Sequence, residues 1–403
     1  MTTAPPRGDA DALDRHDPLA PLRERFLHRD PQRIYLDGNS LGMPSSTVRA
    51  AVEAALDAWE ERLVTGWEDW IDAPRRAGDL LAAACLGARP GEVLVADSTT
   101  VNLYKLAHAA LDLAEGAVVT DAANFPTDRY VLAGIAEARG RRYVEVEHAA
   151  DAVVVPDAGI VCLSLVDYRS GELLDMAALG KASTARVIWD LSHAAGAVEV
   201  DLSEAELAVG CTYKYLNAGP GAPAWLYVRH GLAAAMRSPI RGWFGQREQF
   251  AMGPAYAPAD GIDRFAAGTP PILGIAAVEA AAGIVGEAGI SRIAAKARAL
   301  TTLAIELADA WLAPLGFEVA TPRDATRRGA HLALRHRDAW RIDRALIERA
   351  NVIPDFREPD VVRLGFSPLT TRFVDVWDGL DRLRALVAEG THLEIETQGH
   401  RVT

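Results

Sequence analysis

Three residue types suited to covalent chemistry with an aldehyde cofactor follow one another in the middle of the chain. Asp190 comes directly after the apolar run 187–189, His193 lies three residues later, and Lys214 stands between two tyrosines. An amine that is partly desolvated among aromatic rings has a lowered pKa and can form a Schiff base. An acid that pairs with the pyridine nitrogen of pyridoxal phosphate (PLP) keeps that ring protonated as an electron sink. The spacing therefore favours PLP as a cofactor.

Each of these residues also has a purely structural interpretation. Asp190 is also typical of a helix cap or turn, and His193 is also typical of a satisfied buried histidine. Only four of the 42 basic residues are lysines, and we interpret Lys105, Lys181 and Lys296 as surface charges that arginine could replace. Lys214 differs, because a guanidinium cannot supply the neutral amine that a Schiff base requires.

Two further segments offer contacts to such a cofactor. Ser98, Thr99 and Thr100 supply hydroxyls and backbone N–H groups between a predicted strand and a predicted helix, where the helix dipole favours a phosphate. The same residues are typical of a plain helix N-cap, and both interpretations are compatible. Phe125 offers a ring that could stack on a flat cofactor, with Asp128 beside it. Taken alone, that segment is better explained as a Phe-Pro turn packed in the core.

The segments that must position these residues alternate between short apolar strands and Ala-rich helices. One helix is expected to begin after Ser45 or Ser46 as its N-cap and to run through Trp59. Alternation of this kind predicts βαβ units and a largely parallel, buried sheet, so the expected fold class is α/β. The strand candidates are 92–95, 117–119, 142–144, 160–163, 187–189 and 224–228.

Three parts are expected along the chain. They are an N-terminal arm over 1–34, a large PLP-binding α/β domain over 35–290 and a smaller C-terminal α+β domain over 291–403. A single long Ala-rich helix, from residue 273 to residue 313, is expected to bridge the two domains. The smaller domain is expected to hold strands over 331–334 and 361–364.

The composition excludes several classes of function. The chain has 403 residues and a formal net charge of −13, so it lacks the basic surface that nucleic acids and anionic membranes bind. It has no apolar run of about 18 residues that could span a membrane and no apolar N-terminal segment typical of a signal peptide. Cys85, Cys162 and Cys211 are widely spaced and odd in number, which indicates reduced thiols. We therefore expect a cytoplasmic enzyme with a small-molecule substrate, and no nucleic-acid or membrane partner.

At these positions the sequence resembles the kynureninase family, whose members are PLP-dependent enzymes of fold type I. The matching segments follow the family's order from near the start of the chain almost to its end. They are LDGNSLG (36–42), DSTTVNLYKL (97–106), NFPTDRY (124–130), VIWDLSHAAGAVEVDL (187–202), GCTYKYLNAGPGAPA (210–224), GWFG (242–245), GTPPI (268–272) and RLGFSPLTTRFVDV (363–376). The resemblance implies the aspartate-aminotransferase-like fold, with a large domain on a mostly parallel sheet and a smaller C-terminal α+β domain.

The resemblance also implies roles for the matching residues of the cofactor site. Lys214 matches the lysine of the Schiff base, Asp190 the partner of the pyridine nitrogen, and His193 a residue beside the ring. Phe125 matches the aromatic side chain stacked on the cofactor, with Asp128 close by. The other implied cofactor contacts within the chain are Thr99, Thr100, Ser164 and Tyr213.

The substrate and the partner subunit are implied in the same way. Arg363 matches the arginine that binds the substrate α-carboxylate, a bidentate contact that suits a guanidinium. Asn39 and Ser40 are expected to line the substrate end of the site. Trp243 and Thr269 match positions that reach the cofactor phosphate from the neighbouring subunit. The resemblance therefore implies a homodimer with shared active sites.

The implied reaction is hydrolytic cleavage of the Cβ–Cγ bond of L-kynurenine, 3-hydroxykynurenine or both, giving anthranilate or 3-hydroxyanthranilate and L-alanine. Lys214 and Asp190 would be catalytic, while Tyr213 suits proton relay and phosphate binding about equally well. Two departures concern the substrate ring. Gln246 stands where the family commonly has histidine, and Thr269 stands where animal members have asparagine.

Several alternatives remain beside this prediction. One is a homologue that acts on a substituted kynurenine in a biosynthetic pathway. Others are a cysteine-desulfurase-like PLP enzyme, which would need an accessible cysteine facing the cofactor, and a non-catalytic PLP-binding protein. Tryptophan catabolism, NAD biosynthesis and the supply of anthranilate for a natural product are all compatible with the implied reaction.

Overall fold

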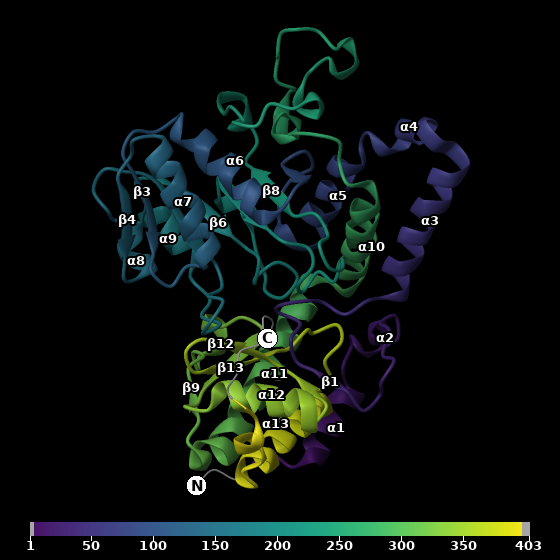
Figure 1. Cartoon of the computed structure of the whole chain (residues 1–403), viewed down its shortest axis with the longest axis vertical. Coiled ribbons are helices and arrows are strands. Elements are labelled where there is room, and N and C mark those ends of the chain that lie inside the picture. The colour runs from purple at the N-terminus through teal and green to yellow at the C-terminus, as the bar shows by residue number, and fades with distance from the viewer. Residues whose placement is uncertain (1–3, 397–403) are drawn as a thin grey trace.

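Seven strands form the central sheet of the larger part of the molecule, in a computed structural model that describes residues 4–396 (Figure 1). Neighbouring strands are parallel apart from β8, which is antiparallel to both β2 and β7. In spatial order the strands are β2 (Val93–Val95), β8 (Trp225–Val228), β7 (Leu207–Gly210), β6 (Arg186–Asp190), β5 (Ala158–Ser164), β3 (Ala117–Asp121) and β4 (Tyr143–Val146). The prediction of an α/β fold with a largely parallel sheet is confirmed.

Both faces of this sheet are covered, and alternate residues of its strands pack into two different apolar clusters. Val161 and Leu163 of β5 face one cluster, whereas Ile160 and Cys162 face the other. Strands buried on both faces are near-continuous apolar runs, which is why five of them could be predicted from the sequence. The sixth predicted strand, β4, lies at the edge of the sheet and is only partly buried. β7 was missed although its four residues are apolar and buried.

Helices α5 and α10 cover the first face of the sheet, and α6 and α7 cover the second. The predicted N-cap of α3 is confirmed, since Ser45 Oγ accepts a hydrogen bond from Val48 N at 3.0 Å. The helices of the described chain are α1 (Arg7–Arg15), α2 (Ala20–Arg23), α3 (Ser46–Arg62), α4 (Trp67–Trp70), α5 (Ala73–Leu81), α6 (Thr99–Leu111), α7 (Pro126–Ala138), α8 (Ala149–Ala152), α9 (Met176–Ala182), α10 (Ile272–Ala288), α11 (Ile290–Leu307), α12 (Ala339–Arg349) and α13 (Phe373–Ala388).

The single bridging helix expected over 273–313 is wrong. The chain breaks at Gly289, which has a φ of +77°, and the axes of α10 and α11 are bent by 79°. A glycine adopts this left-handed conformation without steric cost, so it can end one helix and begin the next. Within residues 4–396 no single helix is long and apolar enough to cross a membrane. Only α10 and α11 taken together reach the necessary length and apolar composition, and they are bent relative to each other.

A four-stranded antiparallel sheet forms the core of the smaller part, in the order β12 (Asp355–Arg357), β13 (Val361–Gly365), β10 (His331–Arg335), β9 (Glu318–Val319). The two predicted strands correspond to β10 and β13. Helices α11, α12 and α13 pack against this sheet around a second apolar core.

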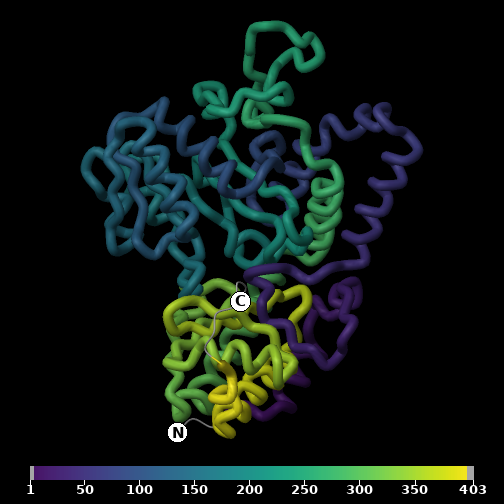
Figure 2. Tube along the Cα trace, in the orientation of Figure 1, coloured from purple at the N-terminus to yellow at the C-terminus, as the bar shows by residue number. Residues whose placement is uncertain are grey.

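The N-terminal segment lies against the smaller part, as the purple and yellow ends of the trace show (Figure 2). The Asp14 carboxylate accepts hydrogen bonds from the first N–H groups of α13, at 2.8 Å from Phe373 N and 3.0 Å from Val374 N. Strand β1 (Ile34–Tyr35) pairs in parallel with β11 (Val352–Ile353). The division at residues 34 and 290 stays a prediction.

Two of the three lysines expected at the surface are buried. Lys105 is fully buried and its Nζ donates to Asp97 Oδ2 at 2.7 Å, while Lys296 is 6% exposed and pairs with Asp17 at 2.7 Å. Only Lys181 is exposed, as expected. A helical pattern of apolar residues does not reveal a buried lysine whose counter-ion comes from another element, and this is why the interpretation was wrong.

Candidate functional site

Lys214 lies just beyond the end of β7, at the edge of the sheet where the parallel strands end. Its Nζ lies 3.1 Å from His193 Nε2, and 5.9 Å from the ring centroids of both Phe125 and Tyr213. Burial lowers the pKa of the Lys214 amine. Burial, together with the positive charge of Lys214, also lowers the pKa of His193 well below its usual range. A neutral imidazole beside the amine leaves Lys214 without an ion-pair partner there, so it can serve as a nucleophile.

Two buried carboxyl groups face each other near this amine. Asp190 ends β6 and is 5% exposed, and its Oδ1 accepts a hydrogen bond from Ser192 N at 2.8 Å. Asp128 lies in the first turn of α7 and is 2% exposed. Burial and the Asp190 charge raise the pKa of Asp128 well above its usual range. Within residues 4–396 the Asp128 Oδ2 atom has no hydrogen-bond partner.

This pair of acids fits a pyridine nitrogen that carries a proton. Two carboxyl groups that share a buried space repel each other when both are ionised, and a cationic N–H donor between them relieves that repulsion. The unpartnered oxygen of Asp128 provides an acceptor for such a donor. The acids and the amine together therefore meet the two demands of PLP at its nitrogen and at its aldehyde.

Asn124 orients the residues beside the acids. Its Oδ1 accepts hydrogen bonds from Ser164 Oγ at 2.6 Å and from Phe125 N at 2.8 Å, and its Nδ2 donates to Thr120 Oγ1 at 2.9 Å. Phe125 is 36% exposed and meets the Tyr168 ring edge-on, with centroids 5.2 Å apart. A ring held at its edge keeps a face for stacking on a flat ligand.

The N-terminus of α6 follows β2 at the end of the sheet. Ser98 is the N-cap of this helix, since its Oγ accepts a hydrogen bond from Val101 N at 3.4 Å. Thr99 and Thr100 form the first turn, where backbone N–H groups point out of the helix and favour an anion. The N-cap interpretation is confirmed, and phosphate binding at this turn stays a prediction.

Arg363 and the 36–42 loop form a second group of site residues. Arg363 is 1% exposed, and its Nε donates to Asp355 Oδ1 at 2.8 Å. Its Nη2 donates to Ser40 Oγ at 3.0 Å and to Asp355 Oδ2, while its Nη1 donates to Tyr168 O. With the amide oxygen turned toward the guanidinium, Asn39 accepts from Nε at 2.7 Å and from Nη2 at 2.9 Å. The structure thus brings the three predicted substrate residues together.

Close backbone approaches join this group to the lysine segment. Gly42 N donates to Tyr213 O at 2.7 Å, and a Cβ added at Gly42 would lie 2.4 Å from Lys214 O. A Cβ added at Gly365 would lie 1.5 Å from the outer end of the Asn39 side-chain amide. Only glycine fits at either place, so the 36–42 loop is held between the amine and Arg363.

The sequence did not reveal several residues of this second group. Asp355 is fully buried and binds both Arg363 and Arg357, the latter at 2.8 Å. His331 is fully buried, its ring centroid lies 6.0 Å from that of His193, and neither ring nitrogen has a partner in the described chain. The Asp-Phe-Arg triplet over 355–357 was a usable signal, whereas nothing adjacent to His331 or Tyr168 marked them in the sequence.

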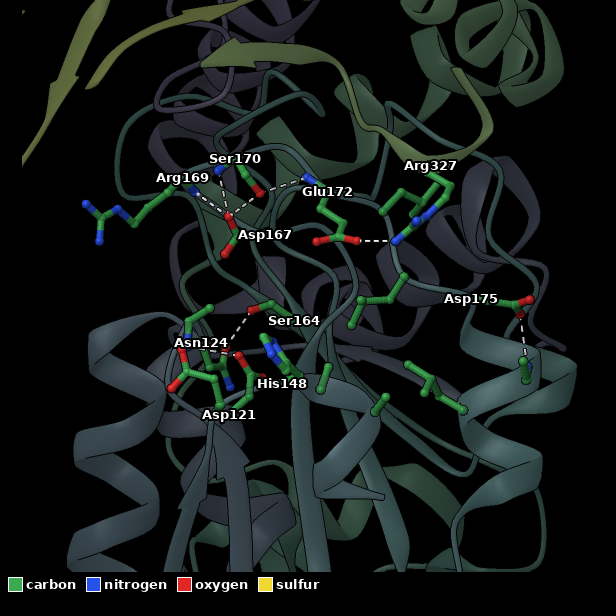
Figure 3. A pocket seen from close by; sticks show the side chains of 18 of the residues that line it. Asp121, Asn124, His148, Ser164, Asp167, Arg169, Ser170, Glu172, Asp175 and Arg327 are labelled. Atoms are coloured by element: carbon green, nitrogen blue, oxygen red, sulfur yellow. Dashed lines mark hydrogen bonds and ion pairs between the residues drawn. The ribbon is translucent and has the colours of Figure 1, made fainter. Parts of the chain in front are cut away.

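An open cavity of about 1190 Å³ adjoins the site on one side (Figure 3). Asn124 and Ser164 form its inner wall, and the Glu172–Arg327 ion pair lies across from them. Among the described residues that line it, neither Lys214 nor Asp190 appears. We therefore place the chemistry at the buried amine and acids, and regard the cavity as a neighbouring cleft between the larger and smaller parts.

Trp243 and Thr269 lie outside these two groups. The Trp243 ring contacts those of Phe244 and Phe250, with centroids 4.5 and 6.1 Å away, and Thr269 is exposed. Trp243 belongs to the stretch between β8 and α10, part of which projects from the top of the molecule in Figure 1. Their proposed role therefore requires a neighbouring subunit and stays a prediction.

Comparisons with known proteins agree with this geometry. Residues 293–383 match the family model of the kynureninase C-terminal domain. The chain is 39% identical over 422 residues to a kynureninase of Pseudomonas fluorescens, with all of both chains covered.

Solved structures show the same fold at lower identity. A lysine-to-alanine mutant of C-DES with glycine covalently linked to the PLP cofactor superposes with a TM-score of 0.77 at 16% identity, covering 94% of this chain and 99% of the other. The cysteine desulfurase of Thermococcus onnurineus NA1 gives 0.76 at 17%, covering 96% and 100%. The chain therefore has the fold of the fold type I PLP-dependent enzymes, and by its full-length similarity it belongs to the kynureninase family.

Proposed function

We propose that this chain hydrolyses the Cβ–Cγ bond of L-kynurenine, 3-hydroxykynurenine or both, with PLP as its cofactor. The observation that carries the proposal is the buried amine of Lys214 beside the Asp128–Asp190 pair. The 36–42 loop joins the lysine segment to Arg363, which with Asn39, Ser40 and Asp355 forms what we call the arginine corner. The full-length relative named kynureninase supports this substrate class.

The chain's own residues fit the parts of the cofactor. Lys214 Nζ would hold its aldehyde carbon, the Asp128–Asp190 pair its pyridine nitrogen, and Phe125 one face of its ring. The first turn of α6 would hold the phosphate. PLP bound in this way supplies an electron sink that stabilises negative charge on the substrate carbon next to its amine.

The residues around the amine would handle the protons of the reaction. Lys214 Nζ, once free, would remove the proton from the substrate α-carbon, because its lowered pKa leaves a neutral amine available. Burial raises the pKa of the Tyr213 phenol, so it stays protonated at neutral pH and has a proton to donate. Arg363 would bind the substrate carboxylate beside Ser40.

The overall reaction consumes one water. Its hydroxyl joins the ketone carbon of the side chain, which becomes the carboxyl group of anthranilate. The Cβ–Cγ bond breaks, and the carbon released takes up a proton to become the methyl group of alanine. These atoms balance without an oxidant or a reductant.

A homodimer with shared sites is part of the same proposal. No residue of helix α3 is buried in the described chain, and two of its large apolar side chains, Leu56 and Trp59, are 40% and 56% exposed. An apolar groove of about 380 Å³ runs beside it, lined in part by Trp67 and Leu273. Exposed apolar area of this kind is typical of an interface. A second copy covering α3 would lie near the segment that carries Thr269, which the groove adjoins at Pro270.

Gln246 bears on which substrate ring is preferred. Its Nε2 donates to Ala255 O at 3.0 Å and its Oε1 accepts from Ala257 N at 2.6 Å, so both ends of the amide tie together the loop over 246–257. An amide engaged in this way is not free to contact a ring hydroxyl. We infer that Gln246 shapes the loop rather than reading the substrate ring.

The desulfurase alternative lacks its nucleophile. Cys85, Cys162 and Cys211 are all buried, and burial raises the pKa of each thiol. A reactive cysteine needs an accessible thiolate. Three buried, unpaired thiols also support our proposal of a cytoplasmic location.

Fluorescence of the released product, anthranilate from kynurenine and 3-hydroxyanthranilate from 3-hydroxykynurenine, measured separately, tests the reaction. Lys214→Ala should abolish both turnover and the visible absorbance of the bound cofactor, whereas Lys181→Ala, at an exposed lysine, should leave both intact. A wild-type chain that releases neither anthranilate nor 3-hydroxyanthranilate, or an unchanged spectrum in Lys214→Ala, would contradict the proposal.

A further inference from the structure

Lys105 connects the segment before α6 with the segment around Phe265. Its ammonium group is fully buried, and Nζ donates to Asp97 Oδ2 at 2.7 Å and to Phe265 O at 2.8 Å. Asp97 immediately precedes the N-cap of α6. Phe265 ends a helical turn over 261–265 and lies four residues before Thr269. A buried ammonium group requires hydrogen-bond partners of this kind. Both partners of Lys105 lie next to segments that are expected to bind the cofactor phosphate.

The first partner sets the geometry of the α6 N-terminus. Asp97 has a φ of +48°, a left-handed conformation that few residues other than glycine adopt. Its backbone oxygen accepts from Ala224 N at 2.9 Å, while Asn102 Nδ2 donates to Ala96 O at 2.7 Å. The backbone on either side is thus fixed, and Lys105 holds the Asp97 carboxylate on the inner side of the turn.

The charge of Asp97 matters as much as its conformation. A carboxylate one residue before an N-cap lies close to any anion bound at the first turn of the helix, and like charges there repel. The buried Lys105 ammonium compensates this carboxylate, whose side chain is 31% exposed. Without it, Asp97 would oppose a phosphate at Thr99 and Thr100.

The second partner extends the connection toward Trp243 and Thr269. A Cβ added at Gly242 would lie 2.0 Å from Ala267 O, and Phe244 N donates to Ala267 O at 3.2 Å. The stretches on either side of Trp243 and before Thr269 are therefore packed backbone to backbone. Anchoring Phe265 O fixes both of them relative to α6.

We propose that Lys105 is a positioning residue for the phosphate end of the cofactor site: it holds and neutralises Asp97 so that the first turn of α6 accepts a dianionic phosphate. The inference rests on the proposed function, which puts the PLP phosphate at this turn. A compact ammonium fits between two oxygens in a fully buried space, and a planar guanidinium does not.

The experiment compares two ligands on the full-length chain freed of cofactor. Dissociation constants are measured by absorbance for pyridoxal 5′-phosphate and for pyridoxal, and their ratio gives the preference for phosphate. Lys105→Met should reduce this preference about tenfold or more, the effect of losing one charge-assisted hydrogen bond. Adding Asp97→Asn to Lys105→Met should restore part of it, because the repelling carboxylate is gone.

Lys296→Met is the matched control. Lys296 is also buried and ion-paired at 2.7 Å, but its partner Asp17 belongs to the N-terminal segment. Its loss should lower the unfolding midpoint and leave the preference for phosphate unchanged. If Lys105→Met does not fold, Lys105→Gln, which keeps a donor for Phe265 O, should show the same loss of preference.

The outcomes separate this inference from the proposed function. A wild-type chain that binds pyridoxal as tightly as its phosphate, or releases neither anthranilate nor 3-hydroxyanthranilate, overturns the proposed function and the inference with it. A wild-type preference for phosphate that survives in Lys105→Met and Lys105→Gln overturns the inference alone. An equal loss of affinity for both ligands also overturns it, because that result indicates a general structural role.

Discussion

A single buried carboxylate, that of Asp355, is shared by two arginines. We therefore predict that removing this carboxylate lowers the free energy of unfolding more than removing one of the arginines. Asp355 is 0% exposed and Arg363 is 1% exposed. Arg357 is bound to the same carboxylate at 2.8 Å. Asp355→Asn leaves the buried Arg363 guanidinium beside the partly exposed Arg357 guanidinium, without the carboxylate that they share. Arg363→Met leaves Asp355 still paired with Arg357.

The expected costs follow from this count of unpaired charges. Breaking a buried ion pair so that a charge is left uncompensated costs about 3–5 kcal/mol. Losing hydrogen bonds from a charged group while the remaining partner stays satisfied costs about 1.5–3 kcal/mol. Because the whole stability of a protein is about 5–15 kcal/mol, Asp355→Asn should be the more severe change, even though Arg363 is the larger side chain.

Urea unfolding at pH 7.5, followed by tryptophan fluorescence, measures both free energies of unfolding. Although burial alone would raise it, the pKa of Asp355 is lowered by Arg363 and Arg357. Its contribution is therefore complete above the ordinary carboxyl pKa of about 3.9 and is lost as the pH falls through the lowered value. The gap between the wild type and Asp355→Asn should narrow below that pH. Equal losses in the two variants, or a larger loss in Arg363→Met, would refute the reasoning.

Three further predictions concern strained or unpaired groups. Burial and a neighbouring acid raise the pKa of Asp128, so the folded protein loses stability as the pH rises above about 3.9, the ordinary carboxyl pKa. Asp128→Asn should therefore stabilise the cofactor-free chain more at pH 8 than at pH 5. Parallel profiles of stability against pH in the wild type and the variant would contradict this. Burial raises the pKa of Asp343 to about 7, and neither of its oxygens has a partner in the described chain. Asp343→Asn should therefore add up to about 4 kcal/mol at pH 8 and nothing at pH 4, measured by urea unfolding; a gain that does not depend on pH would count against it. Gly365→Ala should raise the KM for kynurenine by about tenfold or more, because its Cβ would meet the end of the Asn39 side-chain amide at 1.5 Å. Gly283→Ala, where no described atom lies within 4 Å, should leave KM unchanged, and an unaltered KM in Gly365→Ala would show that the loop does not hold substrate.

Much of the large sheet could be predicted because its strands are buried on both faces. The runs ending at Ser164 and Asp190 are apolar throughout and are separated by helical stretches. The β7 strand was missed although its four residues are as apolar and buried as those of β8. The break at Gly289 escaped notice because an Ala-rich pattern continues on both sides of it.

The arginine corner could be predicted only in part. Arg363, Asn39 and Ser40 were identified from a resemblance, but their meeting depends on contacts between residues more than 300 positions apart. Asp355 and His331 were missed, since an acid or a histidine inside a short strand gives no periodic signal. The burial of Lys105 was missed for a related reason, because its partners come from outside its own helix.

The sequence alone indicated six of the seven strands of the large sheet and placed Asp190 at the end of one of them, at the edge where ligands bind. Parallel strands end at one edge, so the acid at the end of β6 and the lysine after β7 had to lie close together. Tertiary structure alone decided which charges are buried and what neutralises them. Asp128 faces Asp190, Asp355 is shared by two arginines, and Lys105 joins Asp97 to Phe265 O. Burial and long-range pairing depend on how the two sheets and their loops pack, and no local pattern of residues encodes that.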